Sequence, residues 1–179
     1  MGENDAILRL AEEAVGIGAW DLDLTTGLLH GTAQFFRIMG LAATGDPVPI
    51  ETTRCLRHPA DRDRVLRDFN AALARGDDHF ETEYRIIRPD GQLRWIFGRS
   101  RIVRDADGRP LRHCGVDVDI TGRKLGEAAL RDSEERFRRV FEQSPLGKAM
   151  ADLDFRFRAV NPALCAMLGY AESELIGRS

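Results

Sequence analysis

His113 and Asp117 are the residues whose types and spacing best suit the binding of a polar ligand. Both belong to the stretch 111–120, which alternates as a β-strand does, so their side chains lie on the same side of that strand. A carboxylate or an imidazole that is buried without a partner costs free energy. If this side faces the interior, the two groups must pair with each other, be hydrated or contact a ligand.

Other reactive groups lack the arrangement that catalysis or metal binding requires. Asp21 and Asp23 share one face of a predicted strand, where we expect a solvated edge rather than an acid–base pair. The three cysteines are far apart and form no C-x-x-C pair, which argues against disulfides and zinc; they are Cys55, Cys114 and Cys165. No G-x-S-x-G, Walker, H-E-x-x-H or dinucleotide-binding motif occurs, so the sequence predicts no enzyme.

Three predicted strands form the framework that carries the polar pair. Residues 80–86, 93–103 and 111–120 combine alternation at period two with aromatic and β-branched side chains. Turn compositions at 89–91 and 105–108 separate the strands. The pattern therefore predicts a three-stranded antiparallel meander.

The residues before this meander predict a second group of elements. Helical spacing and turn residues indicate a helix at 5–15, a hairpin with arms at 20–24 and 28–30, a helix at 32–41, a loop at 45–49 and a helix at 59–74. His58 directly precedes Pro59, where a contact that caps the last of these helices explains it better than metal binding.

Several dispersed motifs resemble those of one family. The motifs R-P-D-G-x-x-R-W, R-D-x-D-G-R-P-L and G-V-D-V-D-I-T-G-R-K follow one another in residues 88–124. This series resembles the C-terminal half of a PAS domain with its PAC-type motif, and F-F-R-I-M-G-L at 35–41 and H-P-x-D at 58–61 resemble the N-terminal half. The resemblance implies an α+β PAS fold, with a five-stranded antiparallel sheet, helices on one face, an N-terminal cap helix and a C-terminal linker helix.

The resemblance also assigns a pocket to the concave face of the sheet. Matched to flavin-binding relatives, alternate residues of the meander would point into it: Thr82, Tyr84, Ile86, Ile96, Gly98, Ser100, His113, Gly115 and Asp117. The other side of the last strand is apolar and needs a cover, either the helix at 5–15 or a second subunit. That side carries Cys114, Val116, Val118 and Ile120.

Three states of this pocket are compatible with the sequence. In the first, no ligand is bound, and Asp117 and His113 satisfy each other or water. In the second, His113, Asp117 and Ser100 hold a small organic ligand or metabolite. In the third, the pocket holds flavin or haem; the absence of the light-sensing motif N-C-R-F-L-Q, and of a histidine in the helix at 59–74, argues against both. The cofactor is therefore unknown, and the sequence requires none.

A predicted helix connects the meander to a second, similar segment. Helical spacing continues from 121 to about 143, with a heptad-like seam at Leu130, Ser133, Phe137, Val140 and Ser144. The seam fits a parallel dimeric coiled coil, which the resemblance favours, or a helix packed on one of the domains. We expect four parts: a cap helix at 1–15, a PAS domain at 16–121, a linker helix at 122–143 and the truncated N-terminal part of a second PAS domain at 144–179.

The second segment repeats the order of helix, hairpin and helix but lacks the meander strands. Its helix at 163–169 resembles the one at 33–40. A hairpin with an unpaired edge and no complete core is predicted to be poorly ordered, or to pack on another subunit or on the first domain. We expect the chain to be a fragment of a longer bacterial multidomain signalling protein.

Composition and charge restrict the class of partner. With 179 residues, 43% hydrophobic and 31% charged, the chain is long enough for one or two globular domains. A net charge of -3 and an acidic N-terminus without an apolar span give no indication of nucleic-acid or membrane binding, so the cytoplasm is expected. The sequence thus predicts a homodimeric sensory module whose linker helix signals to a histidine kinase or cyclic-di-GMP enzyme in the same chain. A constitutive dimerisation scaffold without a ligand is the alternative.

Overall fold

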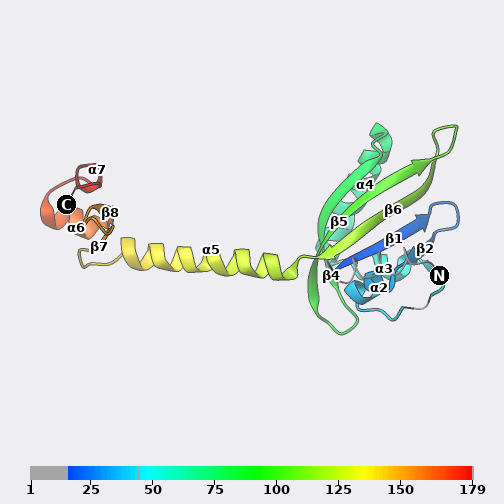
Figure 1. Ribbon diagram of the computed structural model, residues 1–179, viewed down its shortest axis with the longest axis horizontal. Helices are drawn as coiled ribbons and strands as arrows, with labels where there is room; N and C mark the ends of the chain where they lie inside the picture. The colour runs from blue at the N-terminus through cyan, green and yellow to red at the C-terminus, as the bar shows by residue number, and fades with distance from the viewer. Residues whose placement is uncertain (1–15, 44, 179) are drawn as a thin grey trace. The chain divides into compact units, whose positions relative to one another are not determined.

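The computed structural model describes residues 16–43 and 45–178, so the cap helix predicted at 1–15 lies outside the described residues. The chain divides into two compact units, residues 1–124 and 125–179. The first contains a six-stranded sheet and the second a two-stranded sheet (Figure 1). Helices accompany both sheets, and the fold is α+β as predicted.

The sheet of the first unit is antiparallel throughout. Its strands are β1 (Ile17–Asp23), β2 (Leu28–Gly31), β3 (Val48–Pro49), β4 (His79–Ile87), β5 (Leu93–Arg104) and β6 (Pro110–Asp119). They lie in the order β3-β2-β1-β6-β5-β4, so the first strand pairs with the last at the centre. The predicted hairpin is present as β1 and β2, and the predicted meander as β4 to β6.

One strand more than predicted is present. It is β3, which lies in the segment 45–49 that the sequence predicts as a loop. Val48 pairs with Leu29, and Pro49 pairs with Leu28. A proline lacks the N–H that continues a ladder of hydrogen bonds, so it is tolerated at the edge of a sheet, where β3 lies. The sheet therefore has six strands where the sequence predicts five. The additional strand is a short edge strand that pairs only with β2 among the described strands.

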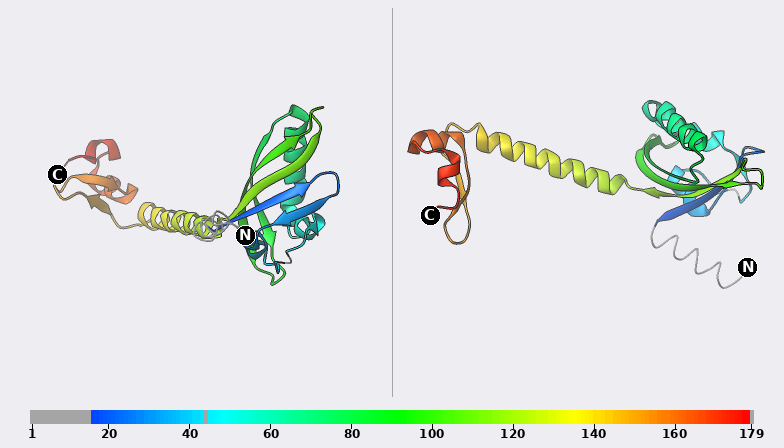
Figure 2. Two further views of the ribbon diagram at one scale, coloured as in Figure 1. Left: turned by 45° about the vertical axis from the view of Figure 1, so that its right-hand side comes forward. Right: turned by 90° about the horizontal axis from the view of Figure 1, so that it is seen from above.

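Three helices pack on one face of this sheet: α2 (Ala33–Met39), α3 (Glu51–Arg54) and α4 (Pro59–Arg75) (Figure 2). At the start of α4, His58 Nδ1 accepts the backbone N–H of Ala60 at 3.2 Å, which confirms the capping role predicted for this histidine. The helix ends at Gly76 in the left-handed conformation, with φ of 78°. The single turn of α3 has no counterpart in the sequence prediction.

The hydrophobic core lies between this sheet face and α2. Phe35 and Phe36 are buried and contact each other edge to face, with 5.4 Å between ring centroids. A Cβ atom at Gly18 would lie 2.4 Å from the Cα atom of Phe35, so only glycine lets α2 approach β1 this closely. Burial of each large apolar side chain contributes about 1.5–3 kcal/mol, which holds the helices over the sheet.

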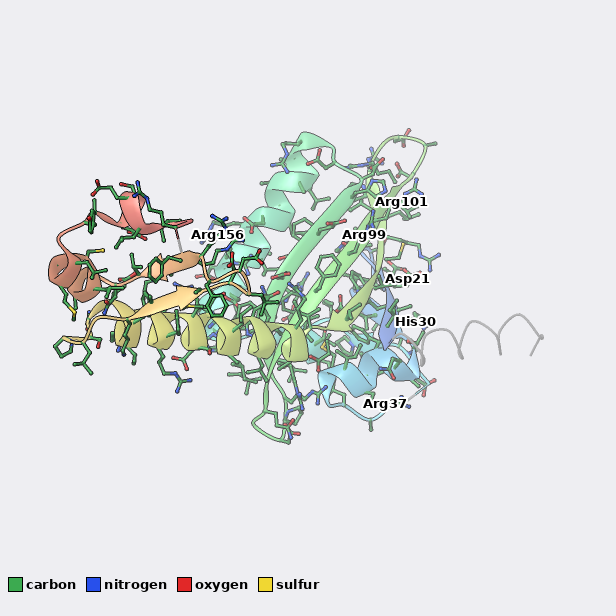
Figure 3. All side chains as sticks on the ribbon, turned by 60° about the vertical axis from the view of Figure 1, so that its left-hand side comes forward. Asp21, His30, Arg37, Arg99, Arg101 and Arg156 are labelled. Carbon is green, nitrogen blue, oxygen red and sulfur yellow. The ribbon has the colours of Figure 1, made fainter. Side chains whose placement is uncertain are left out.

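The opposite face of the sheet carries charged side chains. Asp21 forms an ion pair with Arg112, and Arg99 forms one with Glu81 at 3.0 Å (Figure 3). Asp23 instead accepts backbone N–H groups of the turn that follows it. Asp21 and Asp23 are therefore engaged in separate local contacts, and their arrangement is not that of an acid–base pair.

The second unit contains most of α5 (Thr121–Glu142), a hairpin of β7 (Ala149–Ala151) and β8 (Phe157–Val160), and the helices α6 (Pro162–Leu168) and α7 (Glu172–Leu175). Strand β7 pairs with β8 alone, so each strand of this hairpin is an edge strand. Large apolar side chains are exposed, among them Leu153 at 99% and Phe155 at 80%. The hairpin and both helices form, and what covers these side chains stays a prediction.

Helix α5 presents the predicted seam to solvent. Leu130, Phe137 and Val140 are mostly exposed, and Phe137 stacks on Phe141 with 5.5 Å between ring centroids. Two ion pairs between residues four apart support the same helix. No helix in the described part of the chain is long and apolar enough to cross a bilayer.

Candidate ligand pocket

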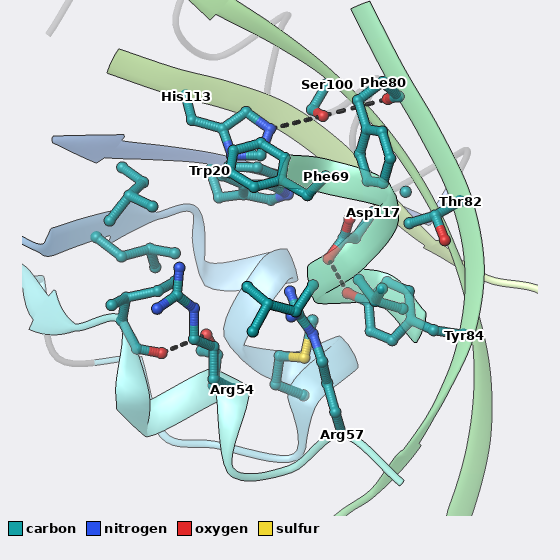
Figure 4. A pocket seen from close by; sticks show the side chains of 18 of the residues that line it. Trp20, Arg54, Arg57, Phe69, Phe80, Thr82, Tyr84, Ser100, His113 and Asp117 are labelled. Carbon is teal, nitrogen blue, oxygen red and sulfur yellow. Dashed lines mark hydrogen bonds between the residues drawn. The ribbon is translucent and has the colours of Figure 1, made fainter. Parts of the chain in front are cut away.

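A cavity of about 70 Å³ lies between the inner face of the sheet and the helices α2 to α4 (Figure 4). A buried water needs roughly 10–15 Å³, so this volume holds about five waters or a ligand of a few non-hydrogen atoms. The lining residues are Trp20, Leu22, Leu29, Phe35, Met39, Ile50, Thr53, Arg54, Arg57, Val65, Leu66, Phe69, Phe80, Thr82, Tyr84, Gly98, Ser100, His113 and Asp117.

The strand register brings several polar residues of the cavity together. Thr82 on β4 pairs with Gly98 on β5, which pairs with Asp117 on β6. Side chains at paired positions point to the same face of a sheet. Residues that are distant in the sequence thereby form one wall.

Asp117 is the buried acid of the cavity, with 3% of its surface exposed. The hydroxyl group of Tyr84 donates to Asp117 Oδ2 at 2.9 Å. A Cβ atom at Gly98 would lie 2.9 Å from Asp117 Oδ1, so the glycine makes room for the carboxylate. Burial raises the pKa of Asp117 to about 6, although Trp20, Tyr84 and Arg57 act to lower it. The carboxyl group therefore changes charge within two pH units of neutrality.

His113 lies at another side of the cavity, where Nε2 is 2.8 Å from Ser100 Oγ. Because Ser100 Oγ donates to the carbonyl oxygen of Phe80 at 3.2 Å, the hydrogen-bond network assigns the imidazole proton to Nε2. The ring stacks on Phe69 at 4.6 Å and contacts Trp20 edge-on at 4.8 Å. Burial, reinforced by nearby arginine charges, lowers the pKa of His113 to about 4, so the imidazole is neutral at pH 7.

His113 and Asp117 do not contact each other, although such a contact is one of the two arrangements that the ligand-free alternative allows; the other, contact with water, stays a prediction. Four residues along an extended strand separate their backbones by about 13 Å. Each group instead contacts a partner on a different strand, Ser100 for the imidazole and Tyr84 for the carboxylate. These pairings depend on the register of the whole sheet.

Three polar groups of the cavity lack a conventional partner among the described residues. Trp20 Nε1 and Thr82 Oγ1 are buried without a hydrogen-bond partner. The indole N–H of Trp20 acts on Asp117 as a hydrogen-bond donor that lowers its pKa, although the two groups do not reach full hydrogen-bond geometry. Arg57 forms no ion pair there; its guanidinium lies 5.3 Å from the ring centroid of Tyr84, and burial lowers its pKa. Such groups mark a place where water or a ligand supplies the missing contact.

Six of the nine residues predicted to face inward line the cavity, namely Thr82, Tyr84, Gly98, Ser100, His113 and Asp117. Ile86 and Ile96 are fully buried in the core instead. Gly115 does not line the cavity, and a Cβ atom there would lie 2.7 Å from the Cβ atom of Ser100. Ile86, Ile96 and Gly115 therefore lie outside the lining of the cavity and support its wall.

Sequence reasoning missed several lining residues, including Trp20, Arg57 and Phe69. Trp20 alternates with Leu22 on the same face of β1, so the period-two rule could have found it. Phe69 lies on the apolar face of α4, where helical spacing gave a second signal. Arg57 lies in the loop between α3 and α4, and no periodicity predicts where a loop side chain points.

The size of the cavity limits what can occupy it. Sites for drug-sized ligands measure about 300–1,000 Å³. The cavity here, about 70 Å³, is smaller than such sites. The described residues also hold no cluster of His, Cys, Asp and Glu suited to a metal ion. Water or a small organic ligand fits.

The last strand of the first unit, β6, leads directly from the cavity to the helix α5. Asp119, two residues after Asp117, accepts the backbone N–H of Thr121 at 2.9 Å, at the start of α5. The hydroxyl oxygen of Thr121 accepts the backbone N–H of Trp95 at 2.9 Å, and the N–H of Ile120 donates to the Trp95 carbonyl oxygen at 2.8 Å. The start of the helix is thereby bound to β5 as well as to β6.

Comparison with known proteins identifies the class. Residues 29–117 match the family described as PAS fold, and residues 135–179 match the family described as PAS domain. A solved structure of a sensory box histidine kinase/response regulator from Burkholderia thailandensis E264 is 34% identical with a TM-score of 0.62, and the match covers 74% of this chain and 98% of that one. This chain therefore belongs to the PAS family, and it carries one PAS domain followed by the beginning of a second.

Curated relatives of the chain are sensor proteins and enzymes of several domains. The sensor protein FixL of Bradyrhizobium diazoefficiens is 27% identical over 171 residues, which are 96% of this chain and 34% of FixL. The probable diguanylate cyclase DgcE of Escherichia coli is 25% identical over 173 residues, which are 95% of this chain and 15% of that protein. This chain thus spans about a third or less of these relatives. The predicted PAS assignment, with a second PAS domain after the first, is confirmed.

Proposed function

We propose that this chain is a cytoplasmic sensory module that detects a small ligand or a partner and transmits the change through α5 to an output domain of the same longer protein. One observation carries the proposal: β6 places Asp117 in the cavity and, two residues later, Asp119 at the start of the helix. The solved structure named as a sensory box histidine kinase/response regulator and the relative named as a probable diguanylate cyclase support a histidine kinase or a cyclic-di-GMP enzyme as the output. Catalysis then belongs to that output domain.

A ligand acts in this mechanism by favouring one of two arrangements of β6. A ligand that bound both arrangements equally would shift neither, so it must contact the polar wall differently in each. The start of α5 is also tied to β4, because Glu83 forms ion pairs with Arg123 at 2.7 Å and with Lys124 at 2.6 Å. Contacts with Lys124 and Arg123 lower the pKa of Glu83, so these pairs persist at neutral pH. A shift between neighbouring strands would reach the helix through these contacts.

The exposed seam of α5 supports a homodimer as the signalling form. Leu130, Phe137 and Val140 recur at spacings of seven and three, which suits packing against the same face of a second α5. In a parallel pair, a movement at the start of each helix alters how the two helices pack. That change is what the output domains would receive.

Phe137→Asp tests the transmission, measured in the full-length protein as dimer affinity and output activity. A carboxylate at the seam should weaken dimerisation at least tenfold and abolish the response of the output. Ala128→Asp is the matched control, because it adds the same carboxylate nine residues earlier, about half a turn around the helix axis. If Phe137→Asp leaves both dimerisation and output unchanged, α5 is not the route of the signal.

A constitutive dimerisation scaffold is the second candidate function. The bond between Tyr84 and Asp117 and the contact between His113 and Ser100 favour it, because these groups satisfy one another without a ligand. An absorption spectrum and a native mass spectrum of freshly purified protein separate the two candidates. A mass above that of the 20.1 kDa chain supports a receptor, whereas a colourless dimer of unmodified chains supports the scaffold.

A further inference from the structure

Arg57 brings a positive charge into the cavity, and no carboxylate of the described residues lies within ion-pair distance of it, although Asp117 lines the same cavity. By contrast, Arg85 forms a two-pronged contact with Asp61, at 2.8 and 2.9 Å. Figure 4 shows the Arg57 side chain extending toward Tyr84, whose ring it contacts at 5.3 Å. Withdrawing a guanidinium from water costs free energy, and here that cost outweighs the charges of Asp117 and Glu51, in agreement with the lowered pKa of Arg57. An anion in the cavity would remove that cost.

The remaining unpartnered groups also favour a ligand rich in acceptors. Guanidinium and indole N–H groups can only donate hydrogen bonds, and a threonine hydroxyl can donate or accept. Arg57, Trp20 and Thr82 therefore offer more donors than acceptors to the cavity. Asp117 can accommodate an anion by taking up a proton on binding, because burial raises its pKa to about 6 and its protonated form donates a hydrogen bond to an oxygen atom. A carboxylate supplies two oxygens with several lone pairs.

The rest of the cavity sets the size and polarity of the ligand. Apolar side chains form its other walls, among them Leu22, Leu29, Phe35, Met39 and Val65. The volume of about 70 Å³ accommodates a ligand of a few non-hydrogen atoms. A second carboxylate would lie against apolar walls without a partner, which is unfavourable. The occupant therefore needs one charged end and one short apolar end.

We propose that the cavity binds a small aliphatic monocarboxylate, with its carboxylate on Arg57 and Trp20 and its alkyl end against the apolar walls. This inference rests on the proposed sensory function and specifies the chemical class of its ligand. Acids of roughly two to four carbon atoms match the volume. The carboxylate end reaches the polar wall that contains Asp117, which is the wall continuous with α5.

The two tryptophans of the chain make the test specific. Trp20 lines the cavity, whereas Trp95 lies outside it, with the ammonium of Lys124 5.2 Å from its ring centroid. Each indole N–H gives a separate signal in a proton–nitrogen NMR spectrum of the labelled chain. Titration with sodium propionate should shift the Trp20 signal saturably and leave that of Trp95 in place. Propionamide, which has the same shape without the charge, should bind at least tenfold more weakly.

Substitution of the guanidinium tests its role directly. Arg57→Gln should weaken propionate binding at least tenfold, since hydrogen bonds to a charged partner are lost. Arg101→Gln removes an arginine from the opposite face of the sheet and should change the affinity less than twofold (Figure 3). The Trp95 signal reports whether each variant is folded. If Arg57→Gln does not fold, the comparison of propionate with propionamide in the unaltered chain still tests whether the cavity requires a charged ligand.

Three results would overturn this ligand class. They are equal affinities for propionate and propionamide, unchanged propionate binding by a folded Arg57→Gln variant, and no saturable shift of the Trp20 signal. Equal affinities would leave a ligand pocket in place and remove only the requirement for charge. The sensory function is judged separately by Phe137→Asp, so a failure of the carboxylate assignment is distinguishable from a failure of the signalling route.

Discussion

The helices α2 and α6 have the same local structure in very different surroundings. Each has seven residues and ends at a left-handed glycine, Gly40 with φ of 72° and Gly169 with φ of 76°. Helix α2 buries four large apolar side chains against the six-stranded sheet, whereas α6 buries none. Local sequence is sufficient to begin and end such a helix. Burial requires strands from elsewhere in the chain, and the two-stranded hairpin beside α6 does not provide them.

The residues that cap α2 and α6 differ in the number of hydrogen bonds that their side chains form. The hydroxyl oxygen of Thr32 accepts two backbone N–H groups, one from β1 and one from α2. Asn161 is fully buried and does more: its side chain accepts N–H groups of Lys148 and Leu164 and donates to the carbonyl oxygens of Phe141 and Leu146. In the second unit, one polar side chain thus makes connections that apolar packing makes in the first.

The two units should differ most in the loss of stability when an apolar side chain is shortened at equivalent positions of α2 and α6. Ile38→Ala on α2 should lower the free energy of unfolding by about 2–5 kcal/mol, because it leaves a cavity in a packed core. Met167→Ala at the equivalent position of α6 should change it by at most about 0.5 kcal/mol, because that side chain is 69% exposed. Urea unfolding followed by circular dichroism measures both. Equal losses would show that α6 packs on a partner surface and that the two units are alike.

The pH dependence of stability should arise in the first unit, from two buried groups with opposite signs. The pKa of Asp117 rises from 3.8 to about 6, so its protonated form stabilises the fold and this stability is lost as pH increases from 4 to 6. The pKa of His113 falls from 6.5 to about 4, so its contribution is lost as pH decreases from 6.5 to 4. Each contribution is on the order of 3 kcal/mol.

Single variants should separate these opposing contributions. With Asp117→Asn, stability should increase from pH 4 to 6.5, because His113 alone remains. With His113→Gln, stability should decrease from pH 4 to 6, because Asp117 alone remains. Thermal unfolding at pH 4.5 and 6.5 measures the two slopes. Slopes of the same sign in both variants would show that one of the groups is not buried in solution.

Substitution of the capping residues should destabilise the second unit more than the first, which is the reverse of the order expected for Ile38→Ala and Met167→Ala. Asn161→Ala leaves several buried backbone groups without partners and should destabilise its unit by about 1–3 kcal/mol. Thr32→Ala should cost about 1 kcal/mol, since the sheet continues to hold α2 in place. Hydrogen exchange of backbone amides in each helix reports the two effects separately. A larger effect of Thr32→Ala would mean that packing in the first unit depends on its cap.

The smallest effect is expected where the two units resemble each other, at exposed ion pairs. Arg131→Ala removes the pair with Glu135 on α5 and should cost about 0.3–0.5 kcal/mol at low salt. The same substitution should have no effect at 1 M salt, where such pairs are screened. Urea unfolding at the two salt concentrations provides the comparison. A larger, salt-independent loss would indicate that Arg131 contacts a second copy of α5.

Much of the fold follows from local signals that need no partner. Alternation at period two predicts the meander, and the left-handed glycines and polar caps predict where helices begin and end. The motif around Asp119 and Thr121 predicts the exit into the linker helix, and both residues make the contacts that start α5. The short strand β3 and the single turn of α3 have too few residues for a periodic signal, so the sequence alone does not reveal them.

For the site, the sequence predicts which side chains share one face of each strand, and it does not predict which of them contact one another. Period-two alternation places Thr82, Tyr84, Ser100, His113 and Asp117 on one side of their strands, the resemblance to PAS domains assigns that side to the interior, and all five line the cavity. Which of them pair, and which loop residues join them, depends on contacts between segments far apart in the chain. Tyr84 and Asp117 are 33 residues apart and meet because β4 and β6 flank β5 in a particular register.

The sequence by itself determined the PAS assignment, the course of the strands and the path from β6 into α5, because these depend on neighbouring residues and on motifs of fixed spacing. Only the tertiary structure decided that Asp117 contacts Tyr84, that His113 contacts Ser100 and that Arg57 enters the cavity and contacts the ring of Tyr84. Hydrogen bonds and charges act over a few ångströms in space, and distance along the chain does not predict them. The chemistry of the pocket therefore appears only once the sheet has set its register.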